Sequence, residues 1–290
     1  MSVAVANKSK PFLHWIGSKR RIVNKLIEHL PQGPHYNYYE PFLGGGALFF
    51  QVRHLFKQCF LSDINLDLIT SYNAVKNNPN EVNRLLSLYH KHHSKDYYYK
   101  VKNKYSNNPN EITAKFIYLN KYSFRGIYRV YKNGQSAQTF SGECYIKLHI
   151  ASRINQCSNL LHGVSIYATD FSFIEPQQND FVYFDPPYHK SGERFYTRLP
   201  FDEKDQIRLR DFVYELNNKG VKIMISNNNT AFIRGLYKDF NINTVTVVYS
   251  INEQRNPVNE LIITNYKTVV VFYKKLVDNN YFEFCNLHKV

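Results

Sequence analysis

Tyr36–Asp63 reads YNYYEPFLGGGALFFQVRHLFKQCFLSD, and this order of residues predicts the fold. An aromatic run leads into a glycine turn, an apolar helical stretch, and a second apolar run that ends in an acid. A strand, a glycine turn, a helix and a second strand form the βαβ unit on which nucleotide-type ligands bind. The predicted elements are a strand at 36–42, the turn at 44–46, a helix at 47–55, a strand at 58–61 and a further helix from about Leu66.

The glycine turn predicts a ligand site. Glu40-Pro41-Phe42-Leu43-Gly44-Gly45-Gly46 lies at the carboxyl end of the first strand, where open α/β sheets bind ligands, and glycines allow a ligand to approach the backbone closely. No Lys-Ser or Lys-Thr follows, and the spacing G-x-G-x-x-G is absent, so we expect a ligand without pyrophosphate. Asp63 is placed to accept hydrogen bonds from ribose hydroxyls, to cap the next helix, or to do both.

A second motif, Phe184-Asp185-Pro186-Pro187-Tyr188, follows the apolar run Asn179-Asp180-Phe181-Val182-Tyr183. The run predicts a buried strand whose end presents one carboxylate, one rigid turn and one aromatic ring. Prolines fix φ and lack a donor, so the carbonyl groups nearby stay available to a ligand. This set of groups suits a planar substrate with an exocyclic amine. The alternative is an ordinary end of a strand.

The other patterns complete a mostly parallel, three-layer α/β domain. Residues 19–30 predict an amphipathic helix with a basic first turn. Asp202 caps a helix that ends at Gly220, and a buried strand follows at 221–225. The runs 244–251 and 260–265 predict an antiparallel pair of strands at one edge of the sheet.

Residues 71–152 are rich in Lys, Asn, Tyr and His and poor in aliphatic residues, which indicates an inserted module. Asn78-Pro79 and Asn108-Pro109 each precede an apolar helical pattern and predict two helix starts. Further along, Lys132-Asn133-Gly134 lies between two short runs at 127–131 and 135–140, which is a strong hairpin signal.

The composition favours an anionic partner. The formal net charge is +14, and aromatic residues make up 16% of the chain. This combination favours nucleic acid over a membrane surface, because bases stack on aromatic rings. A compositional bias of the genome is the alternative.

The sequence lacks the usual patterns of metal, disulfide and membrane proteins. Its four cysteines are scattered without a C-x-x-C pair, which predicts reduced thiols. We interpret the histidines at 90, 92 and 93 as solvated residues of a basic helix rather than metal ligands. Neither a signal peptide nor an apolar run near the roughly 18 residues of a membrane span is evident, so we expect a soluble intracellular protein.

The motifs and their order resemble those of the Dam-like DNA adenine-N6 methyltransferases, the alpha group of the D12 class. Trp15 with Lys19 comes first, then the turn at 40–46, Asp63, a basic insertion, and Asp185 to Tyr188. The resemblance covers the chain to about Tyr266. It implies a Rossmann-like S-adenosylmethionine-dependent methyltransferase sheet with an inserted, mainly helical target-recognition subdomain that carries a β-hairpin. The implied division is a discontinuous catalytic domain at 1–70 and 153–270, the recognition subdomain at 71–152, and a C-terminal tail at 271–290 without an assigned role.

The resemblance implies a role for each matching residue. Trp15 and Lys19 contact the methionine part of the cofactor, and Asp63 holds its ribose. Phe171 stacks on the cofactor's adenine, with plain core packing as the alternative. Ile16 and Ser18 depart from the family, which often has Ala and Gly there. The implied catalytic residues are Asp185 and Pro186, which accept the hydrogens of the target amine, and Tyr188, which stacks on the base; the implied cofactor-binding residues are Trp15, Lys19, Glu40, Phe42, Gly44, Gly46, Asp63, Phe171 and Asp185.

The insertion resembles the part of the family that reads the DNA sequence. Arg129 matches an arginine that contacts guanine, and Phe124 is placed to wedge beside the target base. Arg125 departs from the family, where Asn is common, so the family's GATC target is implied less directly. An ordinary exposed basic loop is the alternative. The implied DNA-binding residues are Lys121, Phe124, Arg125, Arg129 and Tyr131.

The resemblance therefore implies a site-specific enzyme that transfers a methyl group from S-adenosyl-L-methionine to the N6 amine of a flipped-out adenine. S-adenosyl-L-homocysteine is the expected product, double-stranded DNA the expected partner, and no metal is expected. Cytosine-N4 methylation and a catalytically inactive DNA-binding homologue are the alternatives. We expect a cytoplasmic, nucleoid-associated protein without membrane contact that is a monomer in solution and binds DNA in one or more copies.

Overall fold

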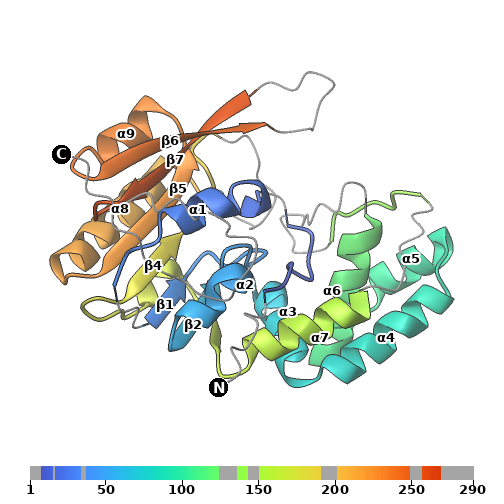
Figure 1. The fold of residues 1–290 in the computed structure, drawn as a ribbon. Coiled ribbons are helices and arrows are strands. Elements are labelled where there is room, and N and C mark those ends of the chain that lie inside the picture. The colour runs from blue at the N-terminus through green and yellow to red at the C-terminus, as the bar shows by residue number, and fades with distance from the viewer. Residues whose placement is uncertain are drawn as a thin grey trace, which may run out of the picture.

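The computed structural model describes residues 8–15, 17–33, 37–123, 136–142, 150–190, 201–248 and 257–268. This part of the chain forms a sheet of seven strands in the order β3-β2-β1-β4-β5-β7-β6 (Figure 1). Strands β1 to β5 pair in parallel, and β7 runs antiparallel to both β5 and β6. The predicted α/β class and the antiparallel edge pair are confirmed. The strands are β1 Asn37–Glu40, β2 Gln58–Asp63, β3 Ser165–Ala168, β4 Phe181–Phe184, β5 Lys222–Asn228, β6 Asn241–Val248 and β7 Pro257–Thr264.

The two sequence motifs meet at one point of the sheet. Strand β1 lies between β2 and β4, so the strand order reverses there. In open α/β sheets, ligands bind outside the carboxyl ends of the strands at such a reversal. Strand β1 ends at Glu40, which begins the glycine motif, and β4 ends at Phe184, just before Asp185. The fold therefore brings the glycine motif beside the Asp185 motif.

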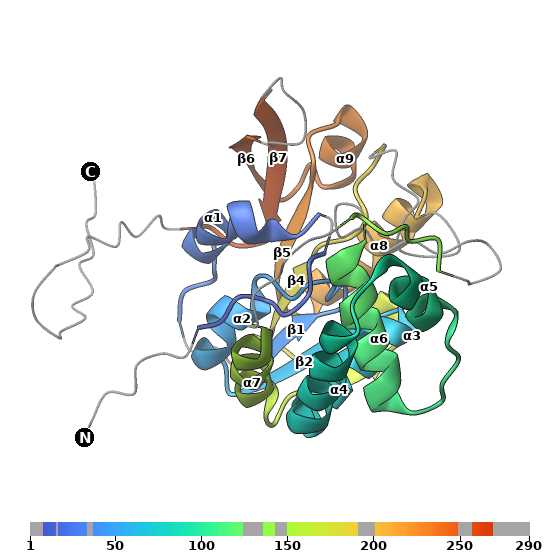
Figure 2. The same ribbon diagram turned by 90° about the vertical axis from the view of Figure 1, so that its right-hand side faces the viewer.

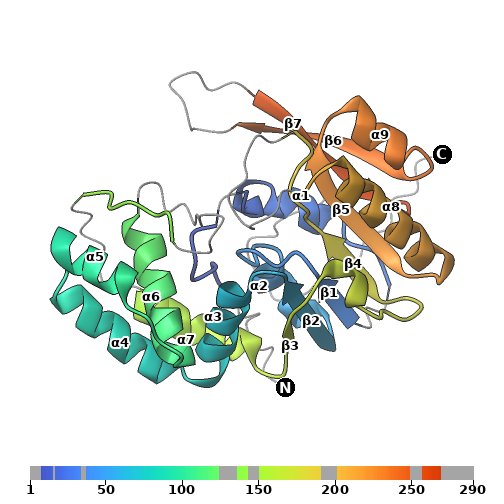
Figure 3. The same ribbon diagram turned by 180° about the vertical axis from the view of Figure 1, so that it is seen from behind.

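Helices cover both faces of the sheet, because successive residues of each strand point to opposite sides. Val182 and Phe184 of β4 share a core cluster with Leu209 of α8, whereas Phe181 and Tyr183 share the other with Leu26 of α1. Figures 1 and 3 show α8 and α9 on one side and α1, α2 and α3 on the other. The helices of these layers are α1 Val23–Glu28, α2 Phe49–Val52, α3 Leu66–Asn77, α7 Ile150–Leu161, α8 Glu203–Asn218 and α9 Ala231–Leu236.

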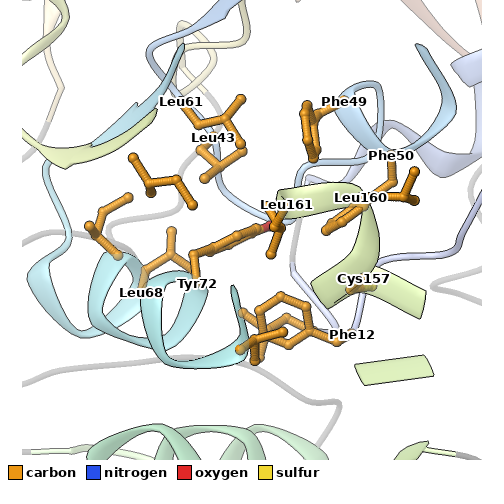
Figure 4. Close-up of a cluster of buried hydrophobic side chains, with 14 of the residues drawn as sticks. Phe12, Leu43, Phe49, Phe50, Leu61, Leu68, Tyr72, Cys157, Leu160 and Leu161 are labelled. Atoms are coloured by element: carbon orange, nitrogen blue, oxygen red, sulfur yellow. The ribbon is translucent and has the colours of Figure 1, made fainter. Parts of the chain in front are cut away.

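The glycine turn packs on a core of aromatic and aliphatic side chains. Figure 4 shows Leu43, the residue before the glycines, together with Phe50 and Tyr72 in this cluster. The Tyr72 hydroxyl donates a hydrogen bond to the Gly44 carbonyl oxygen at 3.2 Å. Tyr72 is fully buried, and its hydrogen bond links α3 to the turn at the end of β1.

The helices of the inserted segment lie beside the sheet (Figure 2), and their buried side chains share one core cluster with α3 and the sheet. They are α4 Pro79–Lys91, α5 Lys95–Asn103 and α6 Pro109–Tyr122. Both predicted helix starts are confirmed, although only the Asn108 side chain caps its helix, by accepting from the backbone N–H groups of Asn110 and Glu111. Helix α3 runs across the predicted boundary at residue 70, and most of the predicted hairpin at 127–140 lies outside the described residues. The domain division stays a prediction.

The histidine interpretation is wrong for two of the three residues. Nδ1 of His90 lies 2.7 Å from the Tyr122 hydroxyl, and Nδ1 of His93 lies 2.7 Å from the Tyr118 hydroxyl. The His93 ring also stacks on Tyr122, with 3.8 Å between ring centroids. These two imidazoles therefore join an aromatic cluster between α4 and α6 instead of facing solvent.

The described part of the chain contains no group of three or more His, Cys, Asp or Glu side chains that could hold a metal ion. Within the same residues, no helix is long and apolar enough to cross a membrane. Cys59 and Cys157 are buried free thiols, and the other two cysteines lie outside the described residues.

Candidate active site

The carboxylate of Asp185 lies just beyond the end of β4 and binds two donors. Lys19 Nζ is 2.9 Å from Asp185 Oδ1, and the Ser226 hydroxyl donates to the same oxygen at 2.6 Å. The Tyr183 hydroxyl lies 2.9 Å from Ser226 Oγ. Burial raises the pKa of Asp185 above its ordinary value, and Lys19 and Ser226 oppose this rise. Asp185 is thus a desolvated carboxylate held in place by side chains from two distant segments.

The ring of Tyr188 is fixed at its face and at its hydroxyl group. Lys19 Nζ lies 4.3 Å from the ring centroid, and the Tyr188 hydroxyl donates to Glu260 Oε2 at 2.8 Å. Burial, with the nearby carboxylates of Asp185 and Glu260, raises the pKa of Tyr188 well above its usual value. The phenol therefore stays neutral and remains a donor. A single ammonium group contacts both the Asp185 carboxylate and the Tyr188 ring.

A buried amide network fixes the turn that carries the two prolines. Gln206 Nε2 donates to the Pro187 carbonyl oxygen at 2.8 Å, and Gln206 Oε1 accepts from Asn227 Nδ2 at 3.1 Å. The Asn227 side-chain oxygen accepts from the backbone N–H of His189 at 3.2 Å. Both amide side chains are fully buried, so the turn has a rigid support.

Asp63 connects the glycine turn to the start of α3. Its Oδ2 accepts from the backbone N–H of Gly44 at 3.0 Å, and its Oδ1 accepts from that of Asn65 at 3.0 Å. The cap of α3 is Asn65 rather than Asp63, because the Asn65 side chain accepts from the Leu68 N–H. Burial raises the pKa of Asp63, and the N–H groups of Asn65 and Gly44 oppose the rise.

Trp15 packs directly on the glycine turn. Gly44 has φ of +46°, and a Cβ at this position would lie 2.8 Å from Trp15 Nε1. At Gly45 a Cβ would lie 3.0 Å from Trp15 Cβ. The turn therefore needs glycine both for its left-handed backbone and for the approach of the indole ring.

We expect Gly44→Ala to lower the free energy of unfolding more than a glycine substitution that costs backbone strain alone. Left-handed φ costs an alanine roughly 1–2 kcal/mol, and at Gly44 the contact with Trp15 adds to it. Gly163, with φ of +72° and nothing within 4 Å of its Cβ position, is the matched control. Urea unfolding of Gly44→Ala and Gly163→Ala measures the difference, and equal losses would contradict the contact with Trp15.

Glu40, at the end of β1, is a buried carboxylate that begins the glycine motif. Only 2% of its surface is exposed, and its Oε2 accepts from the Tyr38 hydroxyl at 2.7 Å. Burial raises the pKa of Glu40 to about 8, and the Tyr38 hydrogen bond opposes part of this rise. Glu40 therefore carries a proton at neutral pH.

Phe42 and Phe171 form a stacked pair beside the turn, with 5.3 Å between ring centroids. Phe171 is 2% exposed, and the Arg208 guanidinium lies 4.2 Å from its ring centroid. Arg208 also forms hydrogen bonds of 2.7 and 3.0 Å to the Asp170 carboxylate. The predicted stacking of Phe171 on a ligand stays a prediction, and it requires Arg208 to leave the ring.

Sequence reasoning missed several residues of this site. Ser226 and Asn227 are polar residues near the carboxyl end of the buried strand β5, and this position beside β4 was a usable signal. Glu260 is an acid at the start of an apolar run in β7, which was a second signal. Gln206 gave none, because its partners depend on how α8 packs. Ile64, which follows Asp63, is a further apolar residue of this segment, and 62% of its surface is exposed.

The structure places only one of the predicted DNA-contacting residues. Lys121 lies in the last turn of α6. Phe124, Arg125, Arg129 and Tyr131 lie outside the described residues.

Comparisons with known proteins point to one family. A family model described as D12 class N6 adenine-specific DNA methyltransferase matches residues 15–251. The type II methyltransferase M.MjaIII of Methanocaldococcus jannaschii is 36% identical over 286 residues, which cover 89% of this chain and 99% of that protein. The type II methyltransferase M1.LlaDCHI of Lactococcus lactis subsp. cremoris is 32% identical, with 89% and 95% covered.

More distant relatives are similar over the same span. A DNA adenine methylase of Vibrio cholerae is 26% identical, with 88% of this chain and 95% of that protein covered. Among solved structures, a putative RNA methyltransferase from Pyrococcus horikoshii overlaps 89% of this chain and 87% of its own, with a TM-score of 0.42 and 8% identity.

Proposed function

The chain belongs to the family of D12 class N6 adenine-specific DNA methyltransferases, and we propose that it methylates the N6 amine of an adenine flipped out of duplex DNA. The methyl donor in this proposal is S-adenosyl-L-methionine. One observation carries the proposal. The Lys19 ammonium group, a nitrogen donor, binds the Asp185 carboxylate and at the same time lies over the Tyr188 ring. An adenine whose amine faced Asp185 and whose ring lay on Tyr188 would use the same two groups.

The chemistry assigned to Asp185 follows from the electronic structure of the amine. The lone pair of an adenine amine is delocalised into the ring, so the amine is a weak nucleophile. Hydrogen bonds from its two N–H groups to Asp185 and to the Pro186 carbonyl hold the nitrogen closer to sp³ geometry and free the lone pair. After the C–N bond forms, the nitrogen is positively charged and gives up a proton, and Asp185 is the carboxylate placed to accept it. Burial, which raises the pKa of Asp185, makes it a better acceptor.

The residues around the glycine turn fit the proposed methyl donor. The left-handed backbone at Gly44 leaves no room for a Cβ, the buried carboxylate of Asp63 lies beside it, and Ile64 offers an exposed apolar side chain. When bound, S-adenosyl-L-methionine supplies a methyl group on a positively charged sulfur. We assign Trp15 and Lys19 to its methionine part, Asp63 to its ribose, and Phe42 and Phe171 to the wall near its adenine. Glu40, Gly44 and Gly46 shape the turn against which it lies.

The role assigned to Lys19 requires its ammonium group to move away from Asp185. Lys19 Nζ contacts Asp185 and donates to the Gly17 carbonyl oxygen at 2.6 Å. Asp185 Oδ1 already accepts from both Lys19 and Ser226, so a target amine that bonds to this oxygen takes the place of the ammonium. Lys19 therefore shifts toward the methionine carboxylate when both reactants are bound, and Asp185 becomes free to accept from the amine.

Nucleoside mass spectrometry of treated DNA tests the proposed function. Incubation of unmethylated duplex DNA with the protein and S-adenosyl-L-methionine is expected to yield N6-methyladenine. Appearance of N4-methylcytosine without N6-methyladenine would contradict the proposal and favour the cytosine alternative. Calorimetry with S-adenosyl-L-methionine separates an inactive homologue, which would bind DNA without binding the methyl donor.

We further propose GATC as the target, read by Arg129 in the inserted module, with Phe124 beside the flipped base and Lys121, Arg125 and Tyr131 as further DNA contacts. Positive charge over the chain, +14 in total, supports contact with the phosphate backbone. The place of action in this proposal is chromosomal DNA in the cytoplasm, for a protein that is a monomer in solution and binds DNA in one or more copies.

Arg129→Ala is expected to relax the choice of sequence. A bidentate arginine–guanine contact contributes about 1–3 kcal/mol of discrimination at one base pair. Sequencing of the methylated sites on an unmodified genome should therefore show one degenerate position in the target. An equal loss of activity on all sequences would mean that Arg129 contacts phosphate instead.

A further inference from the structure

Glu260, on the hairpin that β6 and β7 form at the edge of the sheet, is a buried acid to which the proposed function assigns no role. Glu260 lies in β7, is 2% exposed, and is followed by Leu261, Ile262 and Ile263, all fully buried. A carboxylate in such a place is costly unless strong hydrogen bonds compensate it. The Tyr188 hydroxyl supplies such a bond at 2.8 Å, across 72 positions of the sequence.

The sheet aims this carboxylate at the site. Glu260 lies opposite Asn228 of β5 in the antiparallel register, and opposite residues of neighbouring strands point to the same face. Ser226 is two residues before Asn228 and therefore also points to that face. Ser226 holds the carboxylate of Asp185, and Glu260 holds the hydroxyl of Tyr188. Two adjacent strands thus fix the two groups proposed to bind the amine and the base.

The hydrogen bond restricts the swing of the Tyr188 ring about its first side-chain torsion. The backbone that carries the ring is held by Gln206, which donates to the neighbouring Pro187 carbonyl oxygen. A held backbone still allows more than one staggered position about the first side-chain torsion, and each position puts the ring and its hydroxyl in a different place. A hydroxyl anchored at the far end fixes this position, because rotation about the first torsion moves the hydroxyl oxygen, whereas rotation about the second leaves it on the axis. The phenol remains a donor because burial keeps it protonated.

We propose that Glu260 is a positioning residue that sets the place of the Tyr188 ring for stacking on the target base. This inference rests on the proposed function, because it concerns the base-stacking ring of that site. It gives the β6–β7 hairpin a role in the reaction in addition to completing the edge of the sheet.

A double-mutant cycle tests the link between the two side chains. Glu260→Leu and Tyr188→Phe each remove one half of the hydrogen bond, and each is expected to lower kcat about tenfold. Because both remove the same bond, the double variant is expected to show about the same tenfold loss. A loss near 100-fold in the double variant would overturn the inference, since independent effects multiply.

A second cycle covers the case in which leucine at position 260 prevents folding. Glu260→Gln keeps the shape and an uncharged acceptor, and it is expected to lower kcat about threefold with Tyr188 present and not at all in the Tyr188→Phe background. The same loss in both backgrounds would overturn the inference.

A spectroscopic measurement separates ring placement from a general weakening of the strand. With 2-aminopurine at the target position of the DNA, Glu260→Leu and Tyr188→Phe are expected to change its bound fluorescence to the same value. Thr264→Val is the matched control, because Thr264 is buried on the same face of β7 and its hydroxyl donates to the Tyr266 carbonyl oxygen at 2.9 Å, just beyond the end of the strand. It should lower the unfolding temperature and leave the fluorescence unchanged. A fluorescence change in the control equal to that in Glu260→Leu would overturn the inference.

Wild-type activity distinguishes failure of the inference about Glu260 from failure of the proposed function. If wild-type protein forms N6-methyladenine and the effects multiply, Glu260 has no role in placing the ring and the proposed function stands. If wild-type protein with S-adenosyl-L-methionine forms no methylated base, the proposed function fails and the inference fails with it.

Discussion

Asp185→Ala is expected to lower kcat for DNA methylation by roughly 10²- to 10⁴-fold, the range typical of losing a positioned acid–base group. The carboxylate is assigned the hydrogen bond that frees the amine lone pair, so its loss acts on the transition state more than on binding. Affinity for S-adenosyl-L-methionine should stay near that of wild type, as measured by calorimetry. Turnover near the wild-type rate would refute the role given to Asp185.

The same substitution has a cost in stability that must be separated from its effect on activity. Removing the carboxylate leaves Lys19, whose side chain is 6% exposed, without its ionic partner. Breaking a pair of this kind costs about 2–3 kcal/mol, less than a fully buried pair because 18% of the Asp185 side chain is exposed. Lys19→Met combined with Asp185→Ala should recover much of the stability and none of the activity.

Asp180 offers a matched control for Asp185. It lies just before β4, is 1% exposed, and accepts from the backbone N–H groups of Asn37 and Gln177 at 3.2 and 2.9 Å. These bonds connect the starts of β1 and β4, at the opposite end of β4 from Asp185. Asp180→Asn should therefore lower the unfolding temperature while kcat of the remaining folded protein stays at the wild-type level.

The main features of the fold were predictable because they depend on short stretches of sequence. Strand β1, the glycine turn and β2 follow from apolar runs and from glycines that permit positive φ, and the start of α8 follows from Asp202, whose side chain caps it. The sequence also placed Asp63 and Asp185 correctly at the ends of strands. Parallel strands with helical connections bring such ends to one edge, so a shared site could be expected.

The partners of the site residues could not be predicted, because each pair joins segments that meet only in the folded chain. Lys19 was expected at the cofactor, but the structure brings its ammonium to Asp185 and Tyr188. Nothing local in the segment around Lys19 indicates that contact. The capping role considered for Asp63 belongs to Asn65, since a helix cap is decided by backbone geometry within two residues.

The histidine error has the same origin. The spacing of His90 and His93 on a polar helix gave no sign of the tyrosines of α6, because those rings come from a segment 25 and 32 residues later. Once α4 packs on α6, the hydroxyl groups of Tyr122 and Tyr118 meet the imidazoles. Sequence patterns identify which face of a helix is apolar, but they do not identify the polar side chains that the packing brings together.

We expect a second large effect from Glu40, on how the free energy of unfolding depends on pH. Its pKa is about 8 in the folded chain because of burial, against an ordinary value of 4.5. Below about pH 4.5 the carboxyl group is protonated in both states, so it adds no difference. Between pH 4.5 and 8 the unfolded chain releases the proton while the folded chain keeps it, and the free energy of unfolding falls by roughly 1.4 kcal/mol per pH unit.

Glu40→Gln is expected to remove this contribution. Glutamine keeps an acceptor for the Tyr38 hydroxyl and never ionises, so the variant should gain stability relative to wild type as the pH rises from 5 to 8. The expected relative gain is of order 3 kcal/mol over this range, measured by urea unfolding at each pH. Asp63 and Asp185, whose pKa values are also raised by burial, are present in both proteins, and their charge effect on Glu40 is part of the difference that is measured. Glu175→Gln, at an exposed glutamate, removes the same charge from the surface and serves as the control. If wild type and Glu40→Gln lose stability in parallel between pH 5 and 8, Glu40 is ionised in the folded chain, and a negative charge rather than a neutral carboxyl group lies at the end of β1.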